Sequence, residues 1–328
     1  MAGVLTPPAD LSEELLVTTL ADGWGMDVAG LDYRPVGWGS HHWTVTDAAG
    51  GRWFLTADDL AVKRRTPAET LDEAYQRLRG SLRAAAELHD AGLAFVVAPV
   101  APRGGEPLAR AGERYTVAVH PHLDGRSFGW GEYDLPGHRE AVLEMVIAVH
   151  AAPATACRHA PADDFTVPHR AALAAALAGD LPATGPYARP LARLLGEHAG
   201  PVRDLLASYD RLVAENRDHP AVLTHGEPHP GNTMLTPDGW RLIDWDTAAT
   251  APPERDLWLL AADDDTVLDA YAAATGRPPH RPLLDLYRQR WDIADLAVDI
   301  ARFRAPHAGT PEDTKTYEIL TGILTTLR

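Results

Sequence analysis

The sequence has few of the features that mark secreted, membrane or nucleic-acid-binding proteins. Cys157 is the only cysteine in 328 residues, so no disulfide can form within the chain, and it has no neighbours at metal-ligand spacing. No run of about 18 apolar residues occurs. Residues 1–10 also lack the basic and apolar stretches of a leader peptide. We therefore expect a cytoplasmic protein in a reducing compartment, with no membrane partner.

Basic residues are scarce as well. The chain has 30 Lys and Arg against 46 Asp and Glu, a formal net charge of -16. This charge argues against nucleic acid as a partner, because a phosphate backbone requires a basic surface. It suits a cationic small molecule, but it suits plain solubility equally, so charge alone does not choose between them. The 45% of hydrophobic residues is ordinary for a globular protein with one large core or two modest cores.

The first part of the chain predicts a β-rich lobe that carries one long helix. Alternating and β-branched residues, interrupted by a turn at residues 47–51, predict an antiparallel meander. The predicted strands are residues 33–36, 42–46, 52–56, 95–98 and 115–119. A helix is predicted to begin at Thr66, because Pro67 and Glu69 follow it in the pattern of a capping box, and to end at Gly92.

The composition changes after a polar stretch rich in proline and glycine at residues 120–136, which we interpret as a boundary between lobes. Beyond it, alanine and leucine recur at helical spacing. Helices are predicted at residues 139–151, 171–178, 189–198 and 202–215 and again from Pro253 onwards, with short strands at Leu235 and residues 241–243. The expected fold is α+β, with a β-rich lobe at residues 1–120 and a mainly α-helical lobe at residues 121–328.

The most informative segment is the motif region, LTHGEPHPGNTM at residues 223–234 and RLIDWD at residues 241–246. Two prolines and two glycines in the first part force an extended, tightly turned loop. His225 and His229 therefore cannot share one face of a helix, as a zinc-binding pair at positions i and i+4 must. A zinc site is set aside on this ground.

The same loop has the residues that phosphoryl transfer requires. A carboxylate must accept or orient the proton of the attacking hydroxyl, and an amide oxygen and a second carboxylate must hold metal ions at the nucleotide phosphates. Glu227 is the candidate catalytic residue, and Asn232 and Asp244 are the candidate ligands of Mg²⁺. His225 and His229 are expected to support the loop backbone rather than to transfer protons.

This region resembles the aminoglycoside phosphotransferase family, whose members share the protein-kinase-like fold and usually show HGDxHxGN followed by IDW and an acidic residue. The residues that match are His225, Gly226, His229, Gly231, Asn232, Ile243, Asp244, Trp245 and Asp246. Asp256 matches the family's aspartate that supports the catalytic loop. The resemblance implies a two-lobed kinase that uses ATP or GTP with Mg²⁺. It also implies that the segment containing Val119, His120 and His122 receives the adenine at the hinge between the lobes.

Two departures from the family pattern bear on the chemistry. Glu227 stands where the family has aspartate, which moves the carboxylate outward by about one methylene group, and the geometry of a base counts before its pKa. The lysine expected on the third strand is missing, because Thr56 occupies its place. Lys63 is the nearby lysine. It either takes the place of the strand lysine or belongs with Arg64 and Arg65 to a solvated charge run, and the second interpretation is favoured.

A glycine-containing loop between two predicted strands offers another grip on the phosphates. Gly37 and Gly39 make this loop flexible and rich in free amides, although two glycines in a hairpin also occur simply where positive φ angles are needed. Ser40 and His41 are expected to supply phosphate contacts that the missing strand lysine leaves open.

The region expected to face the acceptor is acidic, since residues 254–299 carry more acidic than basic side chains. In the family such helices line the acceptor pocket, although carboxylates on solvated helix faces are a competing interpretation. The candidate acceptor-binding residues are Asp246, Asp263, Asp292 and Asp295. The tryptophans of this half of the chain are expected to pack in the core or between the lobes, namely Trp240, Trp245, Trp258 and Trp291.

The sequence thus predicts an enzyme that moves the γ-phosphoryl group of ATP or GTP to a hydroxyl of a small cationic molecule, such as an aminoglycoside or another basic antibiotic. A nucleotide-binding pseudokinase and a kinase of a metabolite such as a sugar or an amino alcohol are the alternatives. A monomer or a homodimer is expected.

Overall fold

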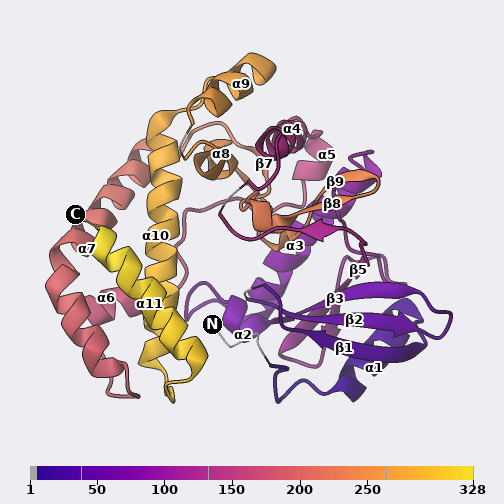
Figure 1. Ribbon diagram of the computed structural model, residues 1–328, viewed down its shortest axis with the longest axis horizontal. Helices are drawn as coiled ribbons and strands as arrows, with labels where there is room; N and C mark the ends of the chain where they lie inside the picture. The colour runs from indigo at the N-terminus through magenta and orange to yellow at the C-terminus, as the bar shows by residue number, and fades with distance from the viewer. Residues whose placement is uncertain (1–5, 38, 132, 263, 328) are drawn as a thin grey trace.

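The computed structural model describes residues 6–37, 39–131, 133–262 and 264–327. Figure 1 shows an antiparallel sheet on one side of the molecule and a group of long helices on the other, with small sheets and shorter helices between them. No helix within the described ranges is both long and apolar enough to cross a membrane. The arrangement is a β-rich part joined to a mainly helical part.

The large sheet forms from the alternating segments near the start of the chain. In spatial order its strands are β1 (Val28–Arg34), β2 (His41–Asp47), β3 (Arg52–Asp59), β5 (Tyr115–Pro121) and β4 (Ala109–Ala111), and each neighbouring pair is antiparallel. Trp43, Val45 and Leu55 point inward and are at most 1% exposed. The predicted meander is therefore confirmed, although β1 begins at residue 28 rather than 33 and β3 runs on to residue 59.

Two helices near the start of the chain were not predicted. In α1 (Glu13–Trp24), Ser12 accepts a hydrogen bond from the Leu15 amide at the first turn, and Gly25 ends the helix with a φ of 68°. These are ordinary start and stop residues, so local sequence could have revealed this helix. The single turn α2 (Leu60–Lys63) follows β3 directly, with the Asp59 carboxylate accepting from the Ala61 amide. These two shorter helices are additional to the one long helix that the sequence predicts for this lobe.

Helix α3 (Leu71–Asp90) begins later than predicted. The pattern of a capping box occurs twice in succession, at Thr66 with Glu69 and at Thr70 with Glu73, and the structure uses the second. Glu69 is not free for capping, because its carboxylate accepts from the Arg65 amide. The buried face of α3 joins the same core as α4 (His138–His150) and α8 (Glu254–Leu260), so this helix connects the two parts of the molecule.

The predicted strand at residues 95–98 is not part of the large sheet. Only Val96 forms a bridge, and its partner is Leu242 in the helical part. Around this bridge the Val97 amide donates to the Leu242 carbonyl at 3.1 Å, and the Leu242 amide donates to the Phe95 carbonyl at 2.8 Å. The extended segment therefore ties the motif region to the end of α3.

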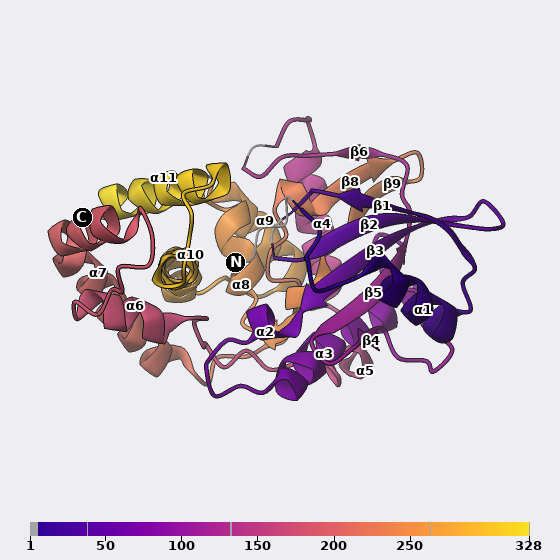
Figure 2. The ribbon, with the colours of Figure 1, turned by 90° about the horizontal axis from the view of Figure 1, so that it is seen from below.

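The helical part is larger and more continuous than its sequence suggests. Its other helices are α5 (Ala154–Cys157), α6 (Arg170–Leu177), α7 (Ala188–Asn216), α9 (Thr266–Thr275), α10 (Arg281–Arg304) and α11 (Pro311–Thr326). The two helices predicted at residues 189–198 and 202–215 are the single helix α7, with Pro201 inside it. The buried stripe of α7 packs on α10 and α11 along its length, which outweighs the hydrogen bond that Pro201 cannot donate (Figure 2).

Two small sheets frame the motif region. One contains β6 (Arg126–Ser127), β8 (Thr233–Thr236) and β9 (Gly239–Leu242), and the other pairs β7 (Val222–Thr224) with β10 (Ala249–Ala251). The loop between β7 and β8 and the turn after β9 therefore lie next to one another. Both open towards the space between the sheet and helix α10.

Candidate active site

The catalytic loop at residues 225–232 is folded back on the carbonyl of Glu227. This oxygen accepts hydrogen bonds from the His229 amide at 2.8 Å and from the Asn232 side chain at 3.0 Å. The His229 carbonyl in turn accepts from the Asn232 amide at 2.9 Å, which forms the short 3-10 helix η1 (Pro230–Asn232). The predicted tight turn is confirmed, and no helix aligns the two histidines.

The two histidines of this loop have different partners, and within the described residues only the His225 ring is hydrogen-bonded to the backbone. The His225 ring is fully buried, lies 2.9 Å from the Ile243 carbonyl through Nε2 and accepts from the Glu227 amide through Nδ1. Burial lowers the pKa of His225, and it lowers the pKa of His229 to about 4. Both rings are therefore neutral near pH 7, which suits a supporting position better than acid catalysis.

Asp256 anchors the loop from α8. Its carboxylate is 0% exposed and accepts from the amides of His225 at 2.9 Å and Gly226 at 2.6 Å. His150 Nε2 lies 3.1 Å from the same carboxylate, and its Nδ1 lies 2.9 Å from the Tyr271 hydroxyl. Burial alone would raise the pKa of Asp256, but the hydrogen bond and charge of His150 hold it below its usual value. The sequence did not identify His150 or Tyr271.

Arg255 clamps the loop at the next position. It donates to the Thr224 hydroxyl and to the Thr247 carbonyl, both at 2.8 Å. Gly226 has a φ of 102°, and a Cβ atom there would collide with the Arg255 guanidinium. Glycine is thus required at position 226 for both conformation and space.

Asp244 and Asp246 lie on the turn that follows β9. Asp244 has a φ of 66°, in the left-handed region that few residues other than glycine adopt. Trp245 holds this conformation, because its ring is 1% exposed and its indole N–H donates to the Leu242 carbonyl at 2.9 Å. A backbone held in such a conformation costs free energy and is common at functional sites.

The two carboxyl groups of this turn are hydrogen-bonded to one another. Burial raises the pKa of Asp244 well above its usual value, and the nearby charges of Asp246 and Glu227 raise it further. Burial would also raise the pKa of Asp246, but the charge of Lys63 lowers it instead. The turn therefore concentrates negative charge that a proton or a cation must neutralise.

Lys63 lies at the centre of the site. Its ammonium group is 2.6 Å from Asp246, 3.0 Å from Asp58 and 3.2 Å from the Ser40 hydroxyl. Its side chain is only 18% exposed. The interpretation of residues 63–65 as a solvated charge run is thus wrong for Lys63, because α2 turns this lysine into the space between the two parts of the molecule.

Lys63 forms no ion pair with Glu69, Glu73 or Glu87, the glutamates on α3 or just before it. Glu69 instead pairs with Arg77 at 3.1 Å, Glu73 caps α3, and Glu87 lies 3.3 Å from His159. Lys63 is instead paired with the strand residue Asp58, whereas the lysine of other kinases pairs with a helix glutamate. Thr56, at the expected lysine position, lies opposite Ala118 within the sheet.

The glycine loop between β1 and β2 contributes one polar side chain to this centre. Gly37 and Gly39 have φ values of 72° and 86°, which explains both glycines. The Ser40 hydroxyl donates to Asp58 at 2.6 Å and accepts from Lys63 at 3.2 Å, and its contact with a phosphate stays a prediction. His41 does not face this centre, because it is 4% exposed and packs with Tyr33 on the core face of the sheet. The expectation of a phosphate contact by His41 is wrong.

The segment expected at the nucleotide hinge ends strand β5. The Val119 carbonyl already accepts from the Val100 amide at 2.7 Å, and the side chain is fully buried. Burial lowers the pKa of His120 to about 4, and its ring contacts the backbone of residues 97 and 98. His122 lies 2.9 Å from the Arg52 guanidinium. A role of Val119, His120 and His122 in adenine binding stays a prediction.

A cavity of about 1010 Å³ opens beside these groups. Glu227, Asp244, Asp246 and Lys63 line it together with residues of α10. The side chain of Glu227 is 35% exposed, and burial together with the charge of Asp246 raises its pKa to about 7. A group with this pKa can accept a proton near neutral pH.

The carboxylates expected to bind the acceptor have different surroundings. Asp246 lines the cavity but is held by Lys63. Burial raises the pKa of Asp292, and it raises that of Asp295 to about 7 with help from the charge of Asp299. Asp263 lies outside the described residues. The cavity is less acidic than expected, because arginines line it as well. Each of three is paired with a carboxylate: Arg77 with Glu69, Arg290 with Asp163, and Arg302 with Asp313.

These features define a kinase-like class of protein, in which a β-rich part and a helical part enclose a lysine, a loop carboxylate and an aspartate pair. Residues 32–288 match the model of the phosphotransferase enzyme family that includes the aminoglycoside phosphotransferases. Protein StrN of Streptomyces griseus is 32% identical over 252 residues, which are 72% of this chain and 74% of StrN. The chain therefore belongs to the phosphotransferase enzyme family, and the resemblance seen in the sequence is confirmed.

Solved structures of low sequence identity share the fold. The spectinomycin phosphotransferase APH(9)-Ia, in complex with ADP and spectinomycin, aligns with a TM-score of 0.70 at 14% identity, over 97% of this chain and 99% of that chain. The amicoumacin kinase hAmiN, in complex with AMP-PNP and Ca²⁺, aligns with a TM-score of 0.58 at 12% identity, over 96% and 93% of the two chains. The predicted kinase-like α+β fold is confirmed, and the protein is a small-molecule phosphotransferase.

Proposed function

We propose that this protein transfers the γ-phosphoryl group of ATP, with Mg²⁺, to a hydroxyl group of a small polar molecule. The observation that carries the proposal is the meeting of Glu227, Lys63 and Asp244 in one cavity large enough for an acceptor. Lys63, rather than a strand lysine, is assigned to the phosphates. Adenine rather than guanine is favoured, because the two relatives of similar fold were solved with ADP and AMP-PNP.

Asp244 and Asn232 fit the donor set that Mg²⁺ prefers. Carboxylate and amide oxygens are hard ligands, and Mg²⁺ usually takes only one or two of them from the protein. Burial and the charges of Asp246 and Glu227 raise the pKa of Asp244, so a cation bound there would stabilise its ionised form. The Asn232 side-chain nitrogen is used by the Glu227 carbonyl, which leaves its oxygen to act as a ligand. Bound Mg²⁺ would neutralise charge on the phosphates during transfer.

Glu227 is assigned to the acceptor hydroxyl. With a pKa of about 7 it is partly ionised at neutral pH, and its ionised form accepts the hydroxyl proton as the oxygen attacks the γ-phosphorus. The backbone of Glu227 is fixed by Asn232 and His229, so the longer side chain alone sets how far the carboxylate reaches. The hydrogen bonds that Asp256 accepts from the loop amides keep the backbone position of this side chain constant.

The acceptor is proposed to be an amine-bearing antibiotic or a related metabolite. Support comes from two structures of similar fold, a spectinomycin phosphotransferase and an amicoumacin kinase. A sugar or amino-alcohol metabolite is the alternative. The pseudokinase alternative is less well supported, because one reason for it was the missing strand lysine and Lys63 supplies a cation at the site. Cytoplasmic location and a monomeric or dimeric state stay predictions.

A transfer assay with labelled ATP, Mg²⁺ and a panel of amino-hydroxyl antibiotics, sugars and amino alcohols tests this function. We expect phosphorylation of at least one acceptor by the wild-type protein and its loss in Glu227→Ala and Asp244→Ala. Undiminished transfer in both variants would refute the residue assignment. Tight ATP binding without transfer to any acceptor would refute the function.

A further inference from the structure

The turn that carries Lys63 is too short to hold its own shape. Helix α2 is a single turn that ends at Lys63, and the last carbonyls of a helix have no partner within it. One turn is also far shorter than a helix that is stable by itself in water. The Lys63 ammonium group nevertheless lies 2.6 Å from Asp246 and 3.0 Å from Asp58. Contacts from outside α2 must therefore fix the place of Lys63.

Arg77 on α3 supplies a contact at the end of this turn. Its Nη2 donates to the Lys63 carbonyl at 2.6 Å, and its Nε donates to the Glu69 carboxylate at 3.1 Å. Because the guanidinium is planar, these two bonds fix its orientation as well as its place. Glu69 also accepts from the Arg65 amide, so the same carboxylate holds the chain just beyond Lys63. The side chains of Arg77 and Glu69 are 21% and 10% exposed, so water screens their contact little.

Helix α3 is itself fixed to the turn that follows β9. One helical turn after Arg77, the Ser81 hydroxyl donates to the Ala248 carbonyl at 2.8 Å, and this serine is 1% exposed. Leu78 and Ala248 belong to the same buried core. Since residues four apart lie on the same face of a helix, one face of α3 holds both the turn that carries the lysine and the turn that carries the aspartates. Figure 2 shows α2 beside α3.

We propose that Arg77 is a positioning residue for the reaction: from α3 it holds the end of α2 and thereby keeps the Lys63 ammonium group beside Asp246. The inference rests on the proposed function, which assigns Lys63 to the phosphates of ATP. In other kinases a helix glutamate pairs with the ammonium group of the lysine. Here the helix holds the backbone of the lysine instead, and the ammonium group is left to Asp58 and Asp246.

Direct binding of the phosphates by Arg77 is the competing explanation, because Arg77 also lines the cavity. The two explanations differ in one respect. A positioning residue loses its effect on ATP affinity when the Lys63 ammonium group is absent, whereas a residue that binds phosphate itself keeps its effect.

A double-mutant cycle on ATP affinity separates the two explanations. Arg77→Gln keeps a donor near the place of Nε, for Glu69, but is too short to reach the Lys63 carbonyl. We expect the Kd of ATP to rise about tenfold, the scale of one lost charge-assisted hydrogen bond, and to rise less than about twofold when the same change is made in Lys63→Met. Arg79→Gln removes a half-exposed partner of Glu106 on the same helix and should change neither Kd. Equal losses in both backgrounds would show that Arg77 binds ATP directly and would overturn the inference.

The position of Lys63 can also be measured without nucleotide, because the chain contains only two lysines, Lys63 and Lys315. In protein made with isotope-labelled lysine, the NMR signals of the two side chains are separate reporters. Arg77→Gln should shift the Lys63 signal and leave that of Lys315, which is exposed on α11, unchanged. Arg79→Gln should shift neither. An unshifted Lys63 signal in Arg77→Gln would overturn the inference.

Two further measurements keep the outcome decisive. If urea unfolding shows that Arg77→Gln does not fold, Arg77→Lys takes its place: it keeps the positive charge but loses the planar fork, so the Kd of ATP should rise about threefold, again only when Lys63 is present. Wild-type ATP affinity in Arg77→Lys would then overturn the inference. Adding ATP and Mg²⁺ to the wild-type protein should shift the Lys63 signal. A Lys63 signal that ATP does not move would refute the assignment of Lys63 in the proposed function, whereas the positioning of Lys63 by Arg77 is decided by the shift in the nucleotide-free protein.

Discussion

Replacing Lys63 with methionine tests the least expected feature of the site. Methionine keeps most of the length and apolar volume of the side chain but removes the ammonium group. In the structure that group is 2.6 Å from Asp246 and 3.0 Å from Asp58. The exposed fraction of the side chain is 18% for Lys63, 20% for Asp246 and 3% for Asp58. The substitution therefore leaves two largely buried carboxylates without their cation.

The magnitude follows from this burial. Removing one partner of a buried ion pair costs about 3–5 kcal/mol, because the remaining charge stays desolvated. Since Lys63 and Asp246 keep some contact with water, we expect a loss near the lower end, about 3 kcal/mol in the free energy of unfolding. If Lys63 also binds the phosphates, one charge-assisted hydrogen bond of about 1.5–3 kcal/mol is lost, which weakens ATP binding about 10- to 100-fold.

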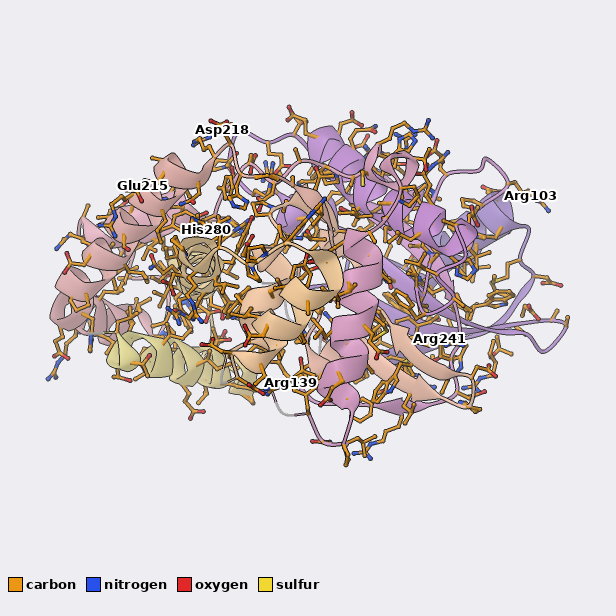
Figure 3. All side chains as sticks on the ribbon, turned by 90° about the horizontal axis from the view of Figure 1, so that it is seen from above. Arg103, Arg139, Glu215, Asp218, Arg241 and His280 are labelled. Atoms are coloured by element: carbon orange, nitrogen blue, oxygen red, sulfur yellow. The ribbon has the colours of Figure 1, made fainter. Side chains whose placement is uncertain are left out.

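Urea unfolding and ATP titration measure the two effects separately. Adding Asp246→Asn to Lys63→Met should recover part of the lost stability, because the uncompensated charge is removed, but it should not restore ATP affinity. Arg103→Met removes an exposed cation at the far end of the β-rich part (Figure 3) and should change neither quantity. Wild-type stability and wild-type ATP affinity in Lys63→Met would show that Lys63 is a solvated surface residue after all.

Three further substitutions have distinct expected outcomes. Glu227→Gln should lower kcat about 10²- to 10⁴-fold with nearly unchanged ATP affinity. The kcat/KM of the wild-type protein should rise as the pH approaches about 7, where Glu227 ionises. An equally active Gln variant would contradict the assigned role of Glu227. Asp256→Asn turns an N–H₂ group towards loop amides that need an acceptor, so both stability, by about 1–3 kcal/mol in urea unfolding, and kcat should fall. Burial would raise the pKa of Asp163, but the charge of Arg290 lowers it. The free energy of unfolding should therefore be higher for the wild type than for Asp163→Asn above about pH 3.8, and this difference should disappear as the pH falls further. A stability gap that persists in acid would contradict the last expectation.

Features that depend on neighbouring residues were predictable from the sequence. The turns of the catalytic loop follow from its prolines and glycines, and the meander follows from alternation. Local patterns failed where two of them competed or where packing outweighed them. Thr66 and Thr70 begin equivalent capping patterns, and only the contact of Glu69 with Arg65 selects the second. Pro201 suggested a helix boundary, but the packing of α7 on α10 continues the helix through it.

The features that the sequence could not show depend on contacts between distant residues. Lys63 and Asp246 are separated by 183 positions, and a basic triplet has the same local pattern whether α2 turns it inward or leaves it in water. This contact also changes the meaning of the substituted catalytic residue. The positive charges of Arg255 and Lys63 lower the pKa of Glu227 against the larger effects of burial and of Asp246. A lysine placed on α2 and a carboxylate carried one methylene further both line the same cavity. The two departures from the family pattern therefore meet in one place, and the variants of Lys63 and Glu227 test one site rather than two.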